Sequence, residues 1–142
     1  MAASVLLLSS LVMMQGAAAA HPTSELIGRW RGTSICTKAD WNAACHDEEA
    51  LYDFKEGVAP GHVLSKGYKV VNGTPEFMGD LDFAWDPGAA AWVAEFAGPR
   101  IRSRWVFSVH GDTIDGRAVL LPAERDARVV HVRRETLKTQ AR

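Results

Sequence analysis

The chain has almost no net charge, and it lacks the motifs by which many enzymes and nucleic-acid binders are recognised. Its 142 residues include 16 Lys+Arg and 17 Asp+Glu, a formal net charge of −1. Nucleic-acid-binding domains usually carry a basic excess or stripe, so this balance argues against a nucleic-acid partner. There is no G-x-S-x-G, no H-E-x-x-H and no glycine-rich phosphate loop before a helix. We therefore expect a non-enzymatic protein with no catalytic residues, no cofactor and no metal site.

Helical periodicity is missing as well. Outside the first twenty residues, no window repeats apolar residues at i, i+3, i+4 and i+7, and 38–49 is expected to hold one helical turn at most. Prolines and turn pairs such as Asn72-Gly73 instead divide the chain into short segments that alternate apolar and polar residues. The segments expected to be strands are 26–36, 49–55, 62–70, 76–84, 90–96, 101–109, 113–120 and 127–134.

The short connections between these segments predict how the strands are arranged. Connections of this length join antiparallel neighbours. A single open sheet of so many strands would leave two unpaired edges and an uncovered apolar face, and closure removes both problems. The sequence therefore predicts an all-β fold, a single small eight-stranded antiparallel up-and-down barrel. A two-sheet β-sandwich is the alternative.

The first twenty residues contain no charged side chain and end in Ala18-Ala19-Ala20. Such a segment is typical of a secretory signal peptide, here cut before His21. A transmembrane anchor needs about 20 predominantly apolar residues, and polar or small residues interrupt this one (Ser9, Ser10, Gln15 and Gly16). We expect 1–20 to be the signal peptide and 21–142 to be one barrel domain. The product would be exported, periplasmic or secreted, with no stable membrane insertion after cleavage.

The chain has 2 cysteines, Cys36 and Cys45. A close pair in an oxidising compartment indicates a disulfide. A redox-active or metal-binding pair usually has C-x-x-C spacing, and eight intervening residues are too many. Closing this loop would restrict the unfolded chain by about 2.5–3 kcal/mol in the entropy model.

The first expected strand contains Gly28-Arg29-Trp30, a G-x-W near the start of a small exported barrel. With this motif at this position, the chain resembles the calycin group, which comprises the lipocalins together with avidin-like and fatty-acid-binding barrels. The resemblance implies that Gly28 and Trp30 belong to a motif that closes one barrel end, with an arginine from the end of the last strand packed across the tryptophan. Arg133 and Arg134 are the candidates, and alternation along the strand favours Arg134. The second and third lipocalin motifs are absent, which implies a compact barrel.

The aromatic residues are the candidates for a ligand site. The chain has 5 Trp, 5 Phe and 2 Tyr, and each aromatic buries about 150–250 Å². Alternation predicts that nine of them point inward: Trp30, Tyr52, Phe54, Phe77, Phe83, Trp92, Phe96, Trp105 and Phe107. They either line a pocket or fill the barrel. We favour a filled lower half with a modest open end, and the expected ligand-binding residues are Tyr52, Phe54, Phe83, Trp92, Trp105 and Phe107.

Several charged groups are interpreted as structural. Arg100, Arg102 and Arg104 form a basic stripe, which we expect to face Asp80, Asp82 and Glu95 on the outer surface. The run 47–49, Asp-Glu-Glu, is interpreted as loop surface rather than a cation site. After cleavage, His21 would carry an α-amine and an imidazole that together could chelate copper, but such a site needs a further histidine from the fold.

Three functions are compatible with these features. The first is a binding protein for a small hydrophobic or amphipathic molecule held in the barrel. The second is a protease inhibitor that works through a protein partner. The chain resembles small bacterial periplasmic barrels that inhibit metalloproteases through an N-terminal tail, and 21–25 is expected to be a free tail. The third is a structural envelope module without a pocket. An interior cavity favours the first function, and a tail packed against its own barrel argues against the second.

The exported protein is predicted to begin at His21 and to contain one disulfide between Cys36 and Cys45. The physical reason is the small-residue cleavage site together with the oxidising destination. The intact mass of exported protein tests both statements at once. A retained leader, or two thiols that react with an alkylating agent, would contradict this prediction.

Overall fold

A computed structural model of the chain describes residues 20–37 and 43–136. The expected signal peptide, apart from Ala20, lies outside the described residues. The elements follow one another as η1 (Thr23–Glu25), β1 (Gly28–Cys36), β2 (Glu48–Glu56), β3 (Val63–Val71), β4 (Thr74–Asp86), β5 (Ala91–Ala97), β6 (Arg102–His110), β7 (Thr113–Leu121) and β8 (Arg125–Arg134).

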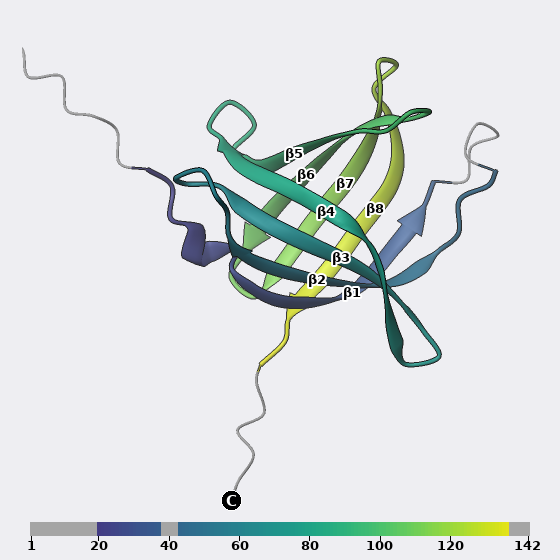
Figure 1. Ribbon diagram of the computed structural model, residues 1–142, viewed down its shortest axis with the longest axis horizontal. Coiled ribbons are helices and arrows are strands. Elements are labelled where there is room, and N and C mark those ends of the chain that lie inside the picture. Colours follow the sequence, from purple (N-terminus) through teal and green to yellow (C-terminus); the bar gives the residue numbers. More distant parts are fainter. Residues whose placement is uncertain (1–19, 38–42, 137–142) are drawn as a thin grey trace, which may run out of the picture.

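The eight strands form one closed barrel in sequence order (Figure 1). Each strand pairs antiparallel with the next, and β8 pairs antiparallel with β1. The predicted all-β, eight-stranded up-and-down barrel is confirmed, and the sandwich alternative is wrong. The helical turn proposed within 38–49 is not found in the described part of that segment, because 43–47 form a turn and a coil before β2 begins. In the described chain no helix has the length and apolar character needed to span a membrane.

Local sequence accounts for the tight connections. The β3–β4 turn is Asn72-Gly73, and both residues have positive φ angles of 51° and 79°. This is the backbone of the two-residue turn that matches the twist of a hairpin, and asparagine and glycine tolerate it at low cost. The turn therefore sets the register of the longest hairpin in the barrel.

A β-bulge in β4 reverses the orientation expected for Phe77. The register shifts between Gly67 and Tyr68, so that Gly67 pairs with Gly79 but Tyr68 pairs with Phe77. The extra residue, Met78, flips the alternation. Phe77 is 57% exposed and packs against Tyr68, with ring centroids 5.7 Å apart. The expectation that Phe77 points into the barrel is therefore wrong.

Aromatic rings fill the middle of the barrel. Phe54, Phe83 and Phe107 come from three different strands, and their side chains are buried. The ring centroids of Phe83 and Phe107 are 5.0 Å apart, and those of Phe54 and Phe83 are 5.7 Å apart, within the range of favourable aromatic pairs. We call these three residues the aromatic layer. It separates the two ends of the barrel.

Trp30 lies at the centre of one end, which we call the closed end. Its ring is fully buried, and its Nε1 donates a hydrogen bond of 2.8 Å to the Leu26 carbonyl. The guanidinium of Arg134, the cross-strand neighbour of Trp30, lies 4.2 Å from the ring centroid. Gly28 has a φ of 131°, and a Cβ there would lie 2.8 Å from Arg134 Nη1. Glycine at this position therefore gives the arginine room to cross the tryptophan.

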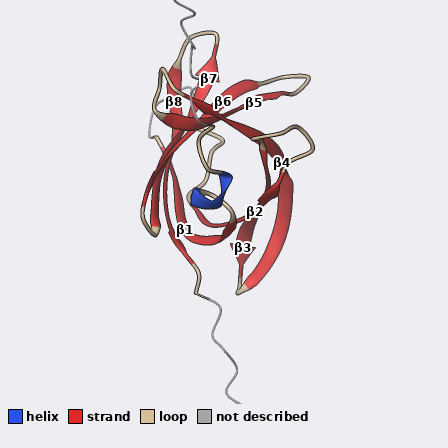
Figure 2. Cartoon of the chain, turned by 90° about the vertical axis from the view of Figure 1, so that its left-hand side faces the viewer, coloured by secondary structure: helices blue, strands red, loops and turns tan. Residues whose placement is uncertain are grey.

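The N-terminal segment covers the closed end rather than extending as a free tail. Figure 2 shows η1 framed by the ring of strands. Arg134 donates to the carbonyls of Ile27 and Glu25 at 2.5 and 2.7 Å. His21 stacks on Trp85, with ring centroids 3.5 Å apart, and its Nε2 pairs with the Glu25 carboxylate. The expectation of a free tail at 21–25 is wrong, because the last strand and the barrel interior both hold this segment.

Replacing Trp30 with alanine is predicted to lower the free energy of unfolding by about 3–5 kcal/mol, the usual loss for a buried large aromatic. The change leaves a cavity under η1 and removes the ring beneath Arg134. Urea denaturation followed by circular dichroism measures it. Phe77→Ala, on the outer surface, is the control and should cost less than about 1 kcal/mol. If the two variants lose the same stability, Trp30 does not hold the closed end together.

Candidate ligand cavity

The end of the barrel opposite η1 is hollow, and we call it the open end. A first cavity of about 280 Å³ is lined by residues of seven strands, all except β7, and these residues include Ala50, Tyr52, Met78, Leu81, Phe96 and Trp105. A second cavity of about 370 Å³ lies between Trp105 and the disulfide-closed β1–β2 connection, with Cys45, Ala118 and Leu120 in its wall. Ile101, Ser103, Trp105 and Arg128 line both. The two cavities are therefore neighbours with a shared wall.

Trp105 is central to that shared wall. It projects inward from β6, and its ring centroid lies 6.2 Å from that of Phe107 in an edge-to-face arrangement. Its Nε1 donates a hydrogen bond of 3.2 Å to the Ser103 hydroxyl. One face of the aromatic layer thus supports the ring from below, while a serine on the same strand satisfies its polar atom. Movement of this side chain would change the shape of both cavities.

Arg128 is the most extensively bonded side chain of the open end. Its Nη1 donates to the Ser34 hydroxyl at 2.8 Å and to the Ser34 carbonyl at 3.2 Å. Its Nη2 donates to the His46 carbonyl at 2.8 Å and lies 3.3 Å from Glu48 Oε1. One arginine of β8 therefore ties β1, the end of the disulfide loop and β2 together inside the barrel.

Tyr52 extends this polar cluster toward the aromatic layer. Its ring packs edge-to-face on Phe107 at 5.4 Å, and its hydroxyl is hydrogen-bonded with Ser34. Burial raises the pKa of Tyr52 well above its usual range, because the phenolate would lose its hydration; the Ser34 hydrogen bond and Arg128 act in the opposite direction. The hydroxyl is therefore neutral at physiological pH and serves as a hydrogen-bonding group.

The disulfide between Cys36 and Cys45 is confirmed. It closes the β1–β2 connection over the open end. Asp47 Oδ1 accepts a hydrogen bond of 2.9 Å from the Cys36 amide, so the same loop is also held by a side chain. Together with the bond from Arg128 to the His46 carbonyl, these contacts fix the described part of the loop beside the second cavity.

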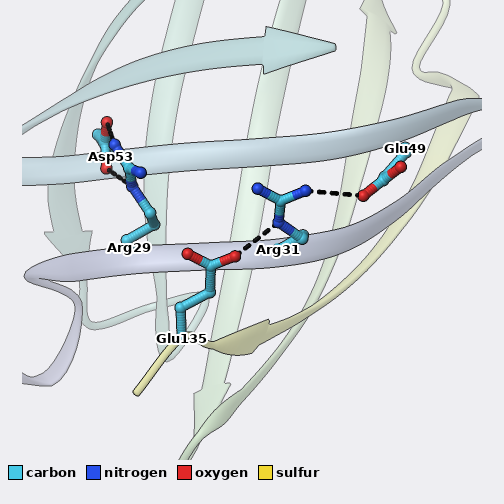
Figure 3. Close-up of polar contacts among 5 residues, drawn as sticks. All are labelled: Arg29, Arg31, Glu49, Asp53 and Glu135. Atoms are coloured by element: carbon cyan, nitrogen blue, oxygen red, sulfur yellow. Dashed lines mark hydrogen bonds and ion pairs between the residues drawn. The ribbon is translucent and has the colours of Figure 1, made fainter. Parts of the chain in front are cut away.

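Charges on the outside of the barrel pair with one another (Figure 3). Arg29 makes two hydrogen bonds to Asp53, at 2.8 and 2.9 Å, and these bonds lower the pKa of the Asp53 carboxyl. Arg31 pairs with Glu135 at 2.6 Å and with Glu49 at 3.0 Å. Exposed pairs of this kind contribute about 0–1 kcal/mol each, so we interpret them as a surface ladder.

The structure differs in part from what we expected for the acidic run at 47–49 and for the basic stripe of Arg100, Arg102 and Arg104. Glu48 does not lie in a surface loop: it is the first residue of β2 and faces the first cavity, because it shares the inward alternation of Ala50 and Tyr52. Arg104 does pair with Glu95 across the strands, at 3.4 Å. Asp82 instead pairs with His62 at 3.0 Å, since β5 separates β4 from the arginines of β6.

The structure brings two of the six expected ligand-binding residues to the first cavity, Tyr52 and Trp105. The other four, Phe54, Phe83, Trp92 and Phe107, are buried in the packed interior and do not line either cavity. The barrel-closing residues lie at the other end, where Arg134 rather than Arg133 crosses Trp30. Sequence reasoning missed Ser34, Glu48, Ser103 and Arg128. Arg128 could have been found, because it shares the alternation of Val130, Val132 and Arg134.

Neither a metal site in the described residues nor a similarity to known proteins assigns a function to this barrel. Among residues 20–37 and 43–136, no group of three or more His, Cys, Asp or Glu side chains is arranged to hold a metal ion. His21 is engaged with Trp85 and Glu25. No protein-family model, no curated protein and no solved structure matches the chain. Its function must therefore be argued from the barrel itself.

Arg128→Met is predicted to lower the free energy of unfolding by about 1–3 kcal/mol, because it leaves several acceptors of the open end without their donor. Urea denaturation measures the loss. Arg102→Met is the matched control: Arg102 is exposed at the start of β6, and the change should stay within about 0.5 kcal/mol of the wild type. Equal effects of the two substitutions would mean that the bonds of Arg128 do not stabilise the open end.

Proposed function

We propose that the protein is an exported, non-enzymatic binding protein that holds one small amphipathic molecule in the open end of its barrel. The observation that carries the proposal is the difference between the two ends. One end is filled by Trp30 beneath Arg134, whereas the other holds a cavity of about 280 Å³. A barrel whose role was only structural would gain stability from filling both ends.

The walls of the first cavity suit an amphipathic molecule. Ligand pockets are mostly apolar with a few placed polar groups, and they range from about 300 to 1,000 Å³. The first cavity, at about 280 Å³, lies just below that range and combines apolar walls with the cluster of Arg128, Glu48 and Ser34. A compact molecule with one polar end fits this arrangement. The second cavity could receive part of it if Trp105 moved.

The closed end supports placing the chain in the calycin group. Trp30 of the G-x-W lies under an arginine from the end of the last strand, and Gly28 leaves room for it. This is the contact that the resemblance implies. Eight-stranded barrels of the lipocalin kind are wide enough to hold one small ligand, which is consistent with a binding role for this chain.

The contacts of the described residues also favour a role without catalysis. No histidine side chain in the described chain lines either cavity. The Ser34 hydroxyl accepts a hydrogen bond from Arg128 and the Ser103 hydroxyl accepts one from Trp105, and among the described residues neither hydroxyl is hydrogen-bonded to a histidine or a carboxylate that would activate it as a nucleophile. Export is supported by the disulfide, which is stable in oxidising compartments.

The protease-inhibitor alternative loses its main support. Such a function was expected to use a free N-terminal tail, but His21 stacks on Trp85 and Arg134 holds the Glu25 carbonyl at 2.7 Å. Withdrawing this segment to reach a protein partner would uncover Trp30, and that exposure would oppose the release.

The binding function predicts saturable uptake of a small neutral dye, N-phenylnaphthylamine, whose fluorescence rises in an apolar site. Trp105→Ala should weaken the binding by about tenfold, which corresponds to about 1.4 kcal/mol. The reason is that the substitution removes the largest side chain that lines the first cavity. Phe77→Ala, on the outside of the same barrel, should leave the binding unchanged. Circular dichroism verifies that both variants fold. An absence of saturable binding with the wild type would contradict the proposed function.

A further inference from the structure

The polar groups around the first cavity differ in how much hydrogen-bonding capacity they have left. Each Nη of an arginine carries two hydrogens. In Arg128, one Nη donates twice to Ser34, and the other donates to the His46 carbonyl and forms an ion pair with Glu48. Three of these four hydrogens are therefore used in hydrogen bonds to protein acceptors, and the nitrogen that carries the fourth lies 3.3 Å from Glu48 Oε1. A bound anion would have to displace one of these acceptors in order to use the paired geometry of the guanidinium.

The charge of Arg128 is also compensated inside the barrel. Its Nη2 lies 3.3 Å from Glu48 Oε1, and the side chains of Arg128 and Glu48 are only 16% and 23% exposed. A carboxylate entering the cavity would meet the carboxylate of Glu48, and such a juxtaposition of like charges is strongly unfavourable in a partly desolvated site. A cation, in turn, would meet Arg128 beside Glu48.

The hydrogen-bonding positions that remain unused around the first cavity favour a ligand with an uncharged donor group. Glu48 Oε1 faces Arg128, so its second carboxylate oxygen can accept a hydrogen bond from a ligand. The Ser103 oxygen accepts from Trp105, and its own hydrogen can be donated. A hydroxyl or an amide N–H can use these groups. A neutral head also avoids the loss of hydration that any ion suffers on entering the barrel.

We infer that the first cavity selects an uncharged amphipathic molecule, one with a hydroxyl or amide head and a short apolar body, and that the Glu48–Arg128 pair rejects the matching ions. The inference rests on the proposed binding function and adds the chemical class of the ligand. Selection of this kind combines an attractive contact with an unfavourable one directed at the competitor. Glu48 supplies both, because it accepts from the neutral head and repels an anionic one.

Three probes with the same body test this assignment: octanol, octanoate and octylammonium. The affinity of each probe is measured by its displacement of N-phenylnaphthylamine from the mature protein at neutral pH. Octanol should bind more tightly than either ion. Since any apolar site prefers the alcohol, the variants are decisive. Glu48→Gln leaves Arg128 uncompensated, so octanoate should gain about tenfold relative to octanol. Arg128→Met leaves Glu48 uncompensated, so octylammonium should gain by a similar factor.

Glu49→Gln is the matched control, because Glu49 is the next residue of β2 but lies on the outer surface with Arg31. It should leave all three affinities unchanged. Either of the two cavity variants suffices if the other fails to fold, since they shift preference in opposite directions. The inference is overturned if an ion binds the wild type as tightly as octanol, or if a folded cavity variant keeps the wild-type ratios. Those results would overturn the assigned ligand class but not the proposed binding function. The binding function itself is contradicted if neither the dye nor any of the three probes binds.

Discussion

Pairing of the first strand with the last is the constraint on which the other features of this barrel depend. The pairing makes Trp30 and Arg134 direct neighbours across β1 and β8. The arginine then covers the tryptophan and holds the carbonyls of Ile27 and Glu25. A single cross-strand contact thus joins the first strand to the last, satisfies backbone acceptors and seals one end of the barrel. Without closure, β1 would be an unpaired edge, and η1 would have nothing to cover.

The two halves of the interior use their side chains for different purposes. The aromatic layer of Phe54, Phe83 and Phe107 fills the interior below the cavities, and it stabilises the fold by burying apolar surface. The open half has a polar scaffold instead, in which Arg128 connects β1, β2 and the disulfide loop. A polar scaffold of this kind can hold walls apart around a hollow, because its hydrogen bonds fix positions without requiring that the space be filled.

The strands and the disulfide could be predicted because their signals are local. Alternation and turn residues such as Asn72-Gly73 define each strand within a few residues, and closure follows from the need to pair both edges. Phe77 was misplaced because a one-residue bulge at Met78 leaves no mark in the local pattern but reverses every orientation beyond it. The docking of His21 on Trp85 was missed because it joins residues far apart in the chain.

The open end was harder to predict for a different reason. Charged residues normally lie on surfaces, so inward alternation alone does not predict that Glu48 and Arg128 face the interior. Each of these residues is stabilised inside the barrel by the charge of the other, and pairing between β2 and β8 is not visible in the sequence. Tyr52 and Trp105 were found, since aromatic residues with inward alternation need no partner to be buried. The walls of the cavity could thus be predicted in part, and its polar cluster could not.

The position of the aromatic layer has a consequence for how such a barrel can evolve. Met78 and Ile101 line the first cavity from the rim and are 57% and 48% exposed, whereas Phe83 and Phe107 below them are fully buried. Replacing a rim residue alters the walls without disturbing the packing beneath. Under the binding role proposed above, substitutions at the rim can therefore change the preferred ligand while the packing of the aromatic layer beneath stays intact.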